Sequence, residues 1–465
     1  MKSRFCPSPT GYMHIGNIRT ALFNSLYALG SQGVFLLRIE DTDKSRSSEE
    51  FSIALMEDMR WLGLNWQEGP EVGGSEVSYY QSERQAIYNR YYKQLEQAKL
   101  VYPCFCSDAH LKLTRKLQQA AGQPPRYPGT CRNLTPQEIA EKEEQGIRPT
   151  LRFIVPQNHV IEFNDLVKGM QRFQSNDIGD YIIRRADGSA SFIFSNAIDD
   201  SLMGVTHAMR GDDHLTNTPR QLLILQALNL TAPTYGHVAL ILGTDGSPLS
   251  KRNGSRSVRE LREEGYLAIA LNNYLARLGH YYESPEFMGF DQLAKNFSTD
   301  NLGKTPAHYD ASQLLHWQKE AIARCDAEFL WQWFGEKVQY IANHQKENFI
   351  NTVRHNVVFP KDALHWAEIF FANSVQYSTE AHDVLKQTAP QFFETALTAV
   401  ENHGTDFKAV SQFVSQQLNI KGKGLFQPLR VAMSGRLDGP EMPAIFNLLG
   451  VDGVKQRLKQ AAEYK

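Results

Sequence analysis

Apolar positions in the first 45 residues repeat at two different spacings. From 18 to 29 they recur every three to four residues, as on one face of a helix, and from 34 to 39 they form a run broken only by Arg38. A strand that is apolar on both faces is typical of a parallel sheet covered by helices. With a strand expected before the glycine-containing turn at 7–17, the pattern predicts a βαβ unit and an α/β fold.

The regular pattern weakens between about 104 and 176. A run rich in proline at 123–129 and short extended runs such as 151–155 take its place. We interpret this stretch as a subdomain inserted into the α/β domain.

Apolar runs return after the insertion. Those at 181–183, 192–194 and 237–242 predict that the parallel sheet resumes, with a helix that opens at Thr218-Pro219. After about residue 255 the spacing is helical and remains so to the end. We therefore expect five segments, at 1–103, 104–176, 177–255, 256–320 and 321–465.

Composition places the chain among ordinary globular proteins. It has 465 residues, 42% of them hydrophobic and 22% charged. The 49 Lys and Arg against 51 Asp and Glu give a net charge of −2, which offers no support for nucleic-acid binding through a global positive field but leaves room for a local basic patch. The sequence has no apolar run of membrane-span length and no signal-peptide region, which predicts a cytoplasmic protein. Its five cysteines, an odd number, indicate reduced thiols or a metal site rather than a disulfide framework.

The first candidate for chemistry is the turn from Pro7 to Asn17, between the first expected strand and helix. Its prolines and glycines stiffen the backbone, His14 stands at the helix entrance and Gly16 lets a ligand approach the backbone. The free N–H groups of a helix start favour a phosphate. A tight turn with a capping histidine is the simpler alternative.

A second candidate is the glycine-flanked basic loop at 245–254, directly after the run 237–242. Lys251 and Arg252 in such a loop would neutralise a polyphosphate or a leaving pyrophosphate. Taken alone, such a loop is more often a solvated basic turn. It gains weight because ligands of α/β sheets bind beyond the carboxyl ends of the strands, which both candidates follow.

These residues carry a resemblance to a known family. The segment from His14 to Asn17 resembles the HIGH signature of class I aminoacyl-tRNA synthetases, in a region bounded by Pro7 and Asn17. The segment from Leu249 to Arg252 resembles their KMSKS loop in its glutamyl-tRNA synthetase form, in a region bounded by Pro248 and Arg252. The match runs in order from residue 2 to about 320 and resumes near Pro428; further matching segments are 38–43, 165–169, 199–207, 210–215 and 217–221.

The resemblance implies a bacterial-type glutamate–tRNA ligase that uses ATP with magnesium to form glutamyl-adenylate and then charges tRNA(Glu). It implies a Rossmann-like catalytic domain in two halves (1–103 and 177–255), an acceptor-binding insertion (104–176), a stem-contact helical domain (256–320) and a helical anticodon-binding domain (321–465). A monomer without membrane contact is expected. By the same analogy the catalytic residues are His14, Gly16 and Lys251; ATP is bound by Thr10, His14, Gly16, Asp213 and Lys251; and glutamate is bound by Arg4, Ser8, Glu40, Phe192, Asn196 and Arg210.

Three positions depart from the family pattern. Pro248 replaces a lysine that commonly begins the second loop, and Phe192 replaces a tyrosine and so lacks its hydroxyl. The third departure concerns zinc. Cys104, Cys106 and Cys131 match the ligands of some relatives, but the fourth position is Asn133, a poor zinc ligand, so that zinc completed by His110 or water and a metal-free cluster both remain open.

The C-terminal end is basic. Residues 421–465 hold eight Lys or Arg and four Asp or Glu, a net charge of +4, whereas 307–420 have a net charge of −5. Lys421, Lys423 and Arg430, with Phe426 among them, are therefore candidate tRNA contacts. A solvated tail is the alternative.

Three rival functions share part of the resemblance. A relative that glutamylates a base within tRNA would lack the helical region after 307, and a glutaminyl-tRNA synthetase would carry C-terminal β-barrels. A non-catalytic RNA-binding or regulatory paralogue would explain Phe192, Pro248 and Asn133 as signs of decay. Whether tRNA(Gln) is charged as well as, or instead of, tRNA(Glu) is not decided by these residues.

Overall fold

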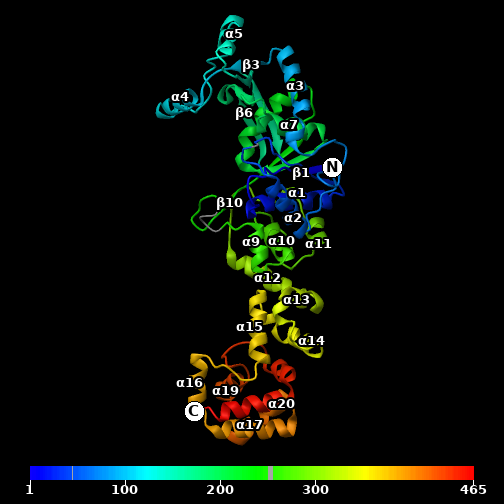
Figure 1. The fold of residues 1–465 in the computed structure, drawn as a ribbon, viewed down its shortest axis with the longest axis vertical. Helices are drawn as coiled ribbons and strands as arrows, with labels where there is room; N and C mark the ends of the chain where they lie inside the picture. Colours follow the sequence, from blue (N-terminus) through cyan, green and yellow to red (C-terminus); the bar gives the residue numbers. More distant parts are fainter. Residues whose placement is uncertain (44, 250–254, 465) are drawn as a thin grey trace. The chain divides into compact units, whose positions relative to one another are not determined.

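The computed structural model describes residues 1–43, 45–249 and 255–464. The chain forms two compact units (Figure 1). One comprises Met1–Arg262 and Leu271–Ala311, and the other Glu263–Ala270 and Ser312–Lys465. We describe each unit separately.

A parallel sheet forms the centre of the first unit. Its order is β2 (Val34–Leu37), β1 (Lys2–Phe5), β8 (His207–Gly211) and β9 (Thr234–Val238), and every neighbouring pair is parallel. Helix α1 (Ile15–Gly30) makes the crossover from β1 to β2 and buries its apolar face. The predicted βαβ unit and α/β fold are confirmed.

A second, antiparallel sheet has the order β3 (Val101–Cys104), β4 (Thr150–Phe153) and β7 (Tyr181–Arg184). The hairpin of β5 (Val160–Asp165) and β6 (Gly169–Gln174) follows β4 in the chain. The run 181–183 is therefore a strand, but the prediction that it continues the parallel sheet is wrong. It pairs instead with β4, which lies within the stretch 104–176 that we interpreted as an insertion.

The run 192–194 was expected to be a strand, and this prediction is wrong as well. Phe192 begins helix α7 (Phe192–Leu202), and Phe194 is fully buried and stacks on Tyr92 at 4.4 Å between ring centroids. A short apolar run does not distinguish a buried helix from a buried strand. Packing against helix α3 (Gln85–Gln97), which carries Tyr92, buries Phe194 here.

The remaining helices of this part of the chain include α8, which opens at Thr218-Pro219 as predicted. The run 237–242 is divided between β9 and β10 (Ile241–Leu242). Strand β10 pairs with β11 (Ala307–His308), which is a short exception to the helical pattern expected after 255. In chain order these elements are α2 (Glu49–Trp61), α3 (Gln85–Gln97), α4 (Asp108–Ala120), α5 (Pro136–Glu144), α6 (Ser175–Ile178), α8 (Thr218–Ala227), β10 (Ile241–Leu242), α9 (Val258–Glu264), α10 (Ala268–Arg277), α11 (Phe290–Lys295) and β11 (Ala307–His308).

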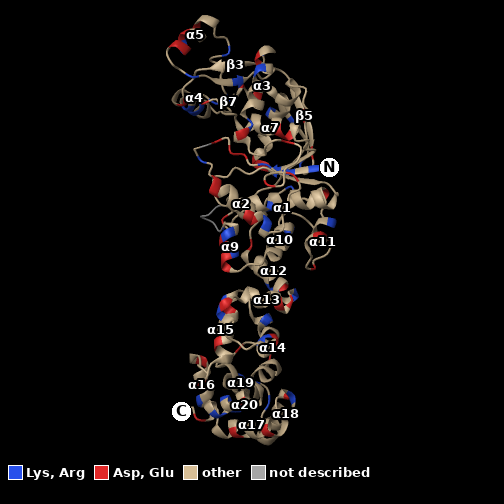
Figure 2. Cartoon of the chain, turned by 45° about the vertical axis from the view of Figure 1, so that its right-hand side comes forward, with Lys and Arg blue, Asp and Glu red and all other residues tan. Residues whose placement is uncertain are grey.

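The second unit is helical throughout its described residues. Its core is apolar and aromatic, with Phe349, Phe393 and Phe446 fully buried. Acidic and basic residues are interspersed along its helices (Figure 2). Its helices are α12 (Ala311–Arg324), α13 (Ala327–Phe334), α14 (Asn343–Val353), α15 (Pro360–Phe371), α16 (Thr379–Gln387), α17 (Pro390–His403), α18 (Phe407–Leu418), α19 (Lys423–Ser434) and α20 (Met442–Ala462).

Among the described residues, no helix has the length and apolar character that crossing a membrane requires.

Candidate active site

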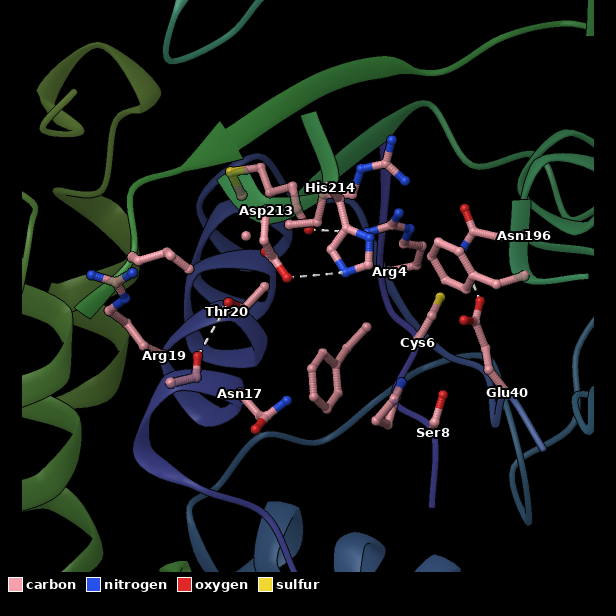
Figure 3. A pocket seen from close by; sticks show the side chains of 18 of the residues that line it. Arg4, Cys6, Ser8, Asn17, Arg19, Thr20, Glu40, Asn196, Asp213 and His214 are labelled. Carbon is pink, nitrogen blue, oxygen red and sulfur yellow. Dashed lines mark hydrogen bonds and ion pairs between the residues drawn. The ribbon is translucent and has the colours of Figure 1, made fainter. Parts of the chain in front are cut away.

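A cavity of about 550 Å³ opens beyond the carboxyl ends of β1 and β8, beside the start of α1 (Figure 3). Parallel sheets of this kind bind ligands at that edge. Residues singled out from the sequence that line the cavity are Arg4, Pro7, Ser8, Thr10, Gly16, Asn17, Glu40, Phe192, Asn196, Arg210 and Asp213. Segments that lie about 200 positions apart in the sequence, around Arg4 and around Arg210, thus converge on one site.

Other predicted residues lie elsewhere. His14 does not line the cavity; its extended backbone caps α1, and its carbonyl accepts the N–H of Ile18 at 3.0 Å. Pro248 is exposed and bridges to Leu242 in an antiparallel manner. Lys251 and Arg252 lie outside the described residues.

Gly16 gives the cavity an open backbone surface at the first turn of α1. A Cβ added at this position would meet nothing within 4 Å. Since the first N–H groups of a helix have no partners within the helix, this turn suits a phosphate or another anion.

Buried ion pairs support the inner wall of the cavity, to which they contribute Arg4 and Glu40. The Asp200 carboxylate pairs with Arg4 at 3.3 Å and with Arg38 at 2.8 Å, and Arg38 also pairs with Oε1 of Glu40 at 3.0 Å. The amide of Asn196 donates to the same Oε1 at 2.7 Å. Among the residues that the structure describes, no hydrogen-bond donor reaches Oε2 of Glu40, which leaves this oxygen for a ligand.

The two carboxylates differ in their electrostatics. Burial raises the pKa of Glu40 above its ordinary value, against the opposing effect of Arg38. Burial acts in the same direction on Asp200, but Arg4 and Arg38 outweigh it and lower the pKa of that carboxyl. Asp200 therefore holds the two guanidinium groups in place, while Glu40 is the carboxylate that faces the cavity.

Arg210 has a different environment from Arg4 and Arg38. Its Nε donates to Nε2 of His237 at 3.2 Å and its Nη2 to Oγ1 of Thr218 at 2.7 Å. Its Nη1 is buried and has no hydrogen-bond partner within the described part of the chain. Burial lowers the pKa of Arg210 to about 10, still well above neutral pH, so the cavity contains a cation with an unused donor.

Several lining residues were not among the sequence candidates, notably Cys6, Arg19, Thr20 and His214. The ring of His214 lies 5.1 Å from that of Phe192 between centroids. Its Nε2 lies 3.8 Å from the carboxylate of Asp213, and the two side chains point toward each other (Figure 3). Burial lowers the pKa of His214 to about 4, so its ring is neutral at pH 7. Its place directly after Asp213, in the turn that follows β8, is the signal that could have identified it.

Comparison with known proteins decides the family. Residues 1–316 match the model for tRNA synthetases class I (E and Q), catalytic domain, and residues 312–462 match the model for an anticodon binding domain. This chain is a class I tRNA synthetase.

Similar proteins agree over the whole length. The chain is 55% identical to glutamate–tRNA ligase 2 of Nitrosococcus oceani, over 100% of this chain and 98% of the relative. It is 52% identical to glutamate–tRNA ligase 2 of Coxiella burnetii, over 100% of both. The crystal structure of a glutamate tRNA ligase from Elizabethkingia meningosepticum, in complex with its amino acid, matches with a TM-score of 0.89 at 26% identity and covers 100% of both chains.

The synthetase brings its three predicted thiols together. The sulfur atoms of Cys104, Cys106 and Cys131 all lie within 4.8 Å of one another. The hydroxyl of Tyr127 lies 3.4 Å from the sulfur of Cys104 and 3.5 Å from that of Cys106, and it accepts the backbone N–H of Cys131 at 2.9 Å. His110, the side chain predicted as an alternative fourth ligand, is exposed and does not belong to this cluster. Asn133, at the position of the family's fourth ligand, is exposed as well.

The predicted tRNA contacts of the C-terminal unit differ in environment. Lys421 and Lys423 are exposed, and Lys423 lines a cavity with the side chains of Gln387, Gln391 and Gln427. Arg430 is half-buried and donates to the carbonyl of Pro440 at 2.8 Å. The lysines are free to face a ligand, whereas Arg430 supports the fold.

Proposed function

We propose that this synthetase activates L-glutamate with ATP to glutamyl-adenylate and transfers the glutamyl group to tRNA(Glu). The observation that carries the proposal is the charge at the cavity wall: Arg4, Arg210 and Glu40 line it, and the buried Arg38 and Asp200 pair with Glu40 and Arg4 from behind, so that three guanidinium groups stand with two carboxylates. Glutamate has two carboxylates and one ammonium group, so its net charge is complementary to this wall. The unused donor of Arg210 suits a carboxylate, and Oε2 of Glu40 suits the ammonium.

The other proposed glutamate contacts support this arrangement. Asn196 holds Glu40 and is itself held by Gln221, whose amide donates to the Asn196 carbonyl oxygen at 2.8 Å. Ser8 and Phe192 line the same cavity, and Phe192 offers an apolar surface in place of a hydroxyl. Arg4 is fixed by Asp200 and donates to the carbonyl of Met209 at 3.0 Å.

ATP enters as its magnesium complex, the substrate form in which the phosphate charge is partly neutralised. We propose that Thr10, Gly16 and Asp213 contact it, since all three line the cavity, and that His14 orients the first turn of α1. Lys251 would stabilise the charge that develops on the leaving pyrophosphate. No covalent enzyme intermediate is required, so catalysis depends on positioning and electrostatics.

Charging assays test the function. The purified synthetase should charge tRNA only when glutamate, ATP and tRNA are all present, and Lys251→Ala should lower kcat by roughly 100-fold or more. Absence of ATP–pyrophosphate exchange with any amino acid, with tRNA present, would favour a non-catalytic paralogue. Unchanged charging by Lys251→Ala would contradict the role of Lys251.

The choice of tRNA needs its own experiment. We propose tRNA(Glu) as the substrate, supported by the glutamate–tRNA ligases to which the chain is similar. Charging of purified tRNA(Glu) and tRNA(Gln) should be compared under the same conditions. Efficient charging of tRNA(Gln) with glutamate would show a broader or different specificity.

We propose that the five segments expected from the sequence act as modules on one tRNA: 104–176 at the acceptor end, 256–320 at the stem and 321–465 at the anticodon. The match of 312–462 to an anticodon binding domain supports the last assignment. We further propose that the enzyme works as a monomer in the cytoplasm. Sedimentation of the full chain with and without tRNA would test the monomer.

We propose that zinc binds among Cys104, Cys106 and Cys131. Three clustered thiols are suitable zinc ligands. The Tyr127 hydroxyl contacts the sulfur atoms of Cys104 and Cys106 and so helps to hold the cluster together. Zinc in such a site would hold the inserted segment together without taking part in the reaction. Metal analysis of the full chain should find about one zinc per molecule, lost in Cys131→Ser and retained in Cys325→Ser, whose thiol lies in the other unit.

A further inference from the structure

Behind Arg210 lies a buried pair that the proposed substrate contacts do not use. Asp165, at the end of β5, and His237, in β9, are both shielded from solvent, and neither lines the cavity. Oδ2 of Asp165 lies 2.5 Å from Nδ1 of His237. On its other side, Nε2 of His237 lies 3.2 Å from Nε of Arg210 and 3.0 Å from Oγ1 of Thr218.

The donors around Asp165 fix where the protons are. Its Oδ1 accepts the backbone N–H groups of Val167 and Lys168 at 2.9 Å and of His237 at 3.1 Å. Although burial alone would raise the pKa of Asp165, these bonds and the His237 ring lower it, so the group is a carboxylate. Nδ1 of His237 must then carry a proton toward Asp165.

The opposite ring nitrogen must be an acceptor. Arginine only donates, so the contact between Arg210 and Nε2 of His237 requires a lone pair on that nitrogen. Burial lowers the pKa of His237, in agreement with a neutral ring. The carboxylate thus selects the tautomer that can receive Arg210.

Geometry carries this effect to the cavity. A guanidinium group is a rigid plane, so fixing two of its nitrogens fixes the direction of the third. His237 holds Nε and Thr218 holds Nη2 at 2.7 Å, which leaves Nη1, the nitrogen without a hydrogen-bond partner among the described residues, as the donor for a ligand.

We propose that Asp165 and His237 are positioning residues for substrate recognition: the Asp165 carboxylate fixes the tautomer and orientation of His237, and His237 aims the Nη1 donor of Arg210 at a carboxylate of the amino-acid substrate. This inference rests on the proposed role of Arg210 in binding glutamate. It assigns a function to side chains that do not touch the substrate.

Two substitutions of His237 separate positioning from packing. The amide of glutamine reaches about as far as Nε2, so His237→Gln keeps an acceptor for Arg210. The amide of asparagine reaches only as far as Nδ1, so His237→Asn keeps a donor for Asp165 but loses the contact with Arg210. Both replace the ring with an amide, which makes each a control for the other.

The measurement is the KM for glutamate and the KM for ATP in pyrophosphate exchange with tRNA present. His237→Asn should raise the glutamate KM about tenfold or more and change the ATP KM less than twofold, while His237→Gln should stay within about threefold of the wild type for both. Equal losses in the two variants, or parallel changes in both KM values, would show that His237 serves packing alone and would overturn the inference.

Arg210→Lys distinguishes a failure of the inference from a failure of the proposed function. If Arg210→Lys leaves the glutamate KM unchanged, Arg210 does not bind the substrate and the premise is wrong. If it raises the glutamate KM whereas His237→Asn does not, the premise stands and the positioning role is wrong. Thermal unfolding of each variant shows whether it folds. If one of the two His237 variants does not fold, the KM values of the other are compared with those of the wild type.

Discussion

At the scale of single residues, Glu40 shows how one carboxylate serves both the protein and a ligand. Arg38 and Asn196 share its Oε1, and Oε2 is left toward the cavity. Glu40→Gln keeps the size of the side chain but removes its charge. We expect the glutamate KM to rise about 10- to 100-fold, because a hydrogen bond to a charged group contributes about 1.5–3 kcal/mol.

The matched control for Glu40→Gln is Glu50→Gln, whose carboxylate accepts from Tyr12 at the surface at 3.3 Å. Kinetics with varied glutamate should show no change in this control. An unchanged glutamate KM in Glu40→Gln would remove Glu40 from the proposed ammonium site.

A second prediction at the scale of single residues concerns His280 and how the stability of the protein depends on pH. Its ring is 5% exposed and stacks on Phe297 at 4.7 Å, and burial lowers its pKa to about 4. An unfolded histidine takes up a proton below about 6.5. Between pH 6.5 and pH 4 the unfolded chain therefore binds a proton that the folded protein does not. The contribution of His280 to the free energy of unfolding is complete above pH 6.5 and decreases toward pH 4, by about 1 kcal/mol per pH unit.

Thermal unfolding between pH 7 and pH 5 checks this prediction. His280→Gln should lose less stability over the interval than the wild type, whereas His308→Gln, which changes an exposed histidine, should follow the wild-type slope. Identical slopes in all three proteins would mean that His280 is not the titrating group.

At the scale of elements, the sequence predicts best where a pattern is local. The βαβ unit of β1, α1 and β2 follows from apolar spacing within 45 residues, and α8 follows from Thr218-Pro219. The runs at 181–183 and 192–194 were assigned to the wrong sheet or the wrong element, because partners distant in sequence decide between strand pairings and between strand and helix.

The same distinction holds for the site. Residues at the end of β1 and the start of α1 could be predicted, since the turn there has a local signature. The partners that hold the cations could not: Asp200 lies 196 positions after Arg4, and Asp165 lies 72 positions before His237. Only the folded sheet brings these pairs together.

A prediction at the scale of elements concerns Gly435, at the end of α19, and its effect on stability. Its φ of 69° is left-handed, and a Cβ there would collide with the carbonyl oxygen of Gln376. Gly435→Ala should therefore lower the stability of the C-terminal unit by about 2 kcal/mol or more. Gly424, in the first turn of the same helix, has no positive φ and no atom within 4 Å of an added Cβ.

Gly424→Ala is thus the control, and it should be neutral or stabilising by up to about 1 kcal/mol because alanine loses less backbone entropy in a helix. Thermal unfolding of the two variants should give shifts of opposite sign or at least clearly different size. Similar shifts would contradict the left-handed helix end.

At the scale of the whole molecule, the net charge of −2 constrains how tRNA is bound. A nearly neutral protein has no global positive field, so binding must depend on localised contacts and weaken only moderately with salt. The basic segment 421–465, net charge +4, is the place where such contacts are expected. Within it Lys421 and Lys423 are exposed, whereas Arg430 bonds to Pro440.

The double variant Lys421→Gln/Lys423→Gln should therefore raise the KM for tRNA and leave the KM for glutamate unchanged. If each lysine neutralises a phosphate, the slope of log affinity against log salt should decrease in magnitude by about 2, since each contact contributes nearly 1. Lys93→Gln, which removes an exposed charge from α3 of the first unit, is the control for net charge. An equal effect of Lys93→Gln would mean that total charge, rather than the C-terminal lysines, governs binding.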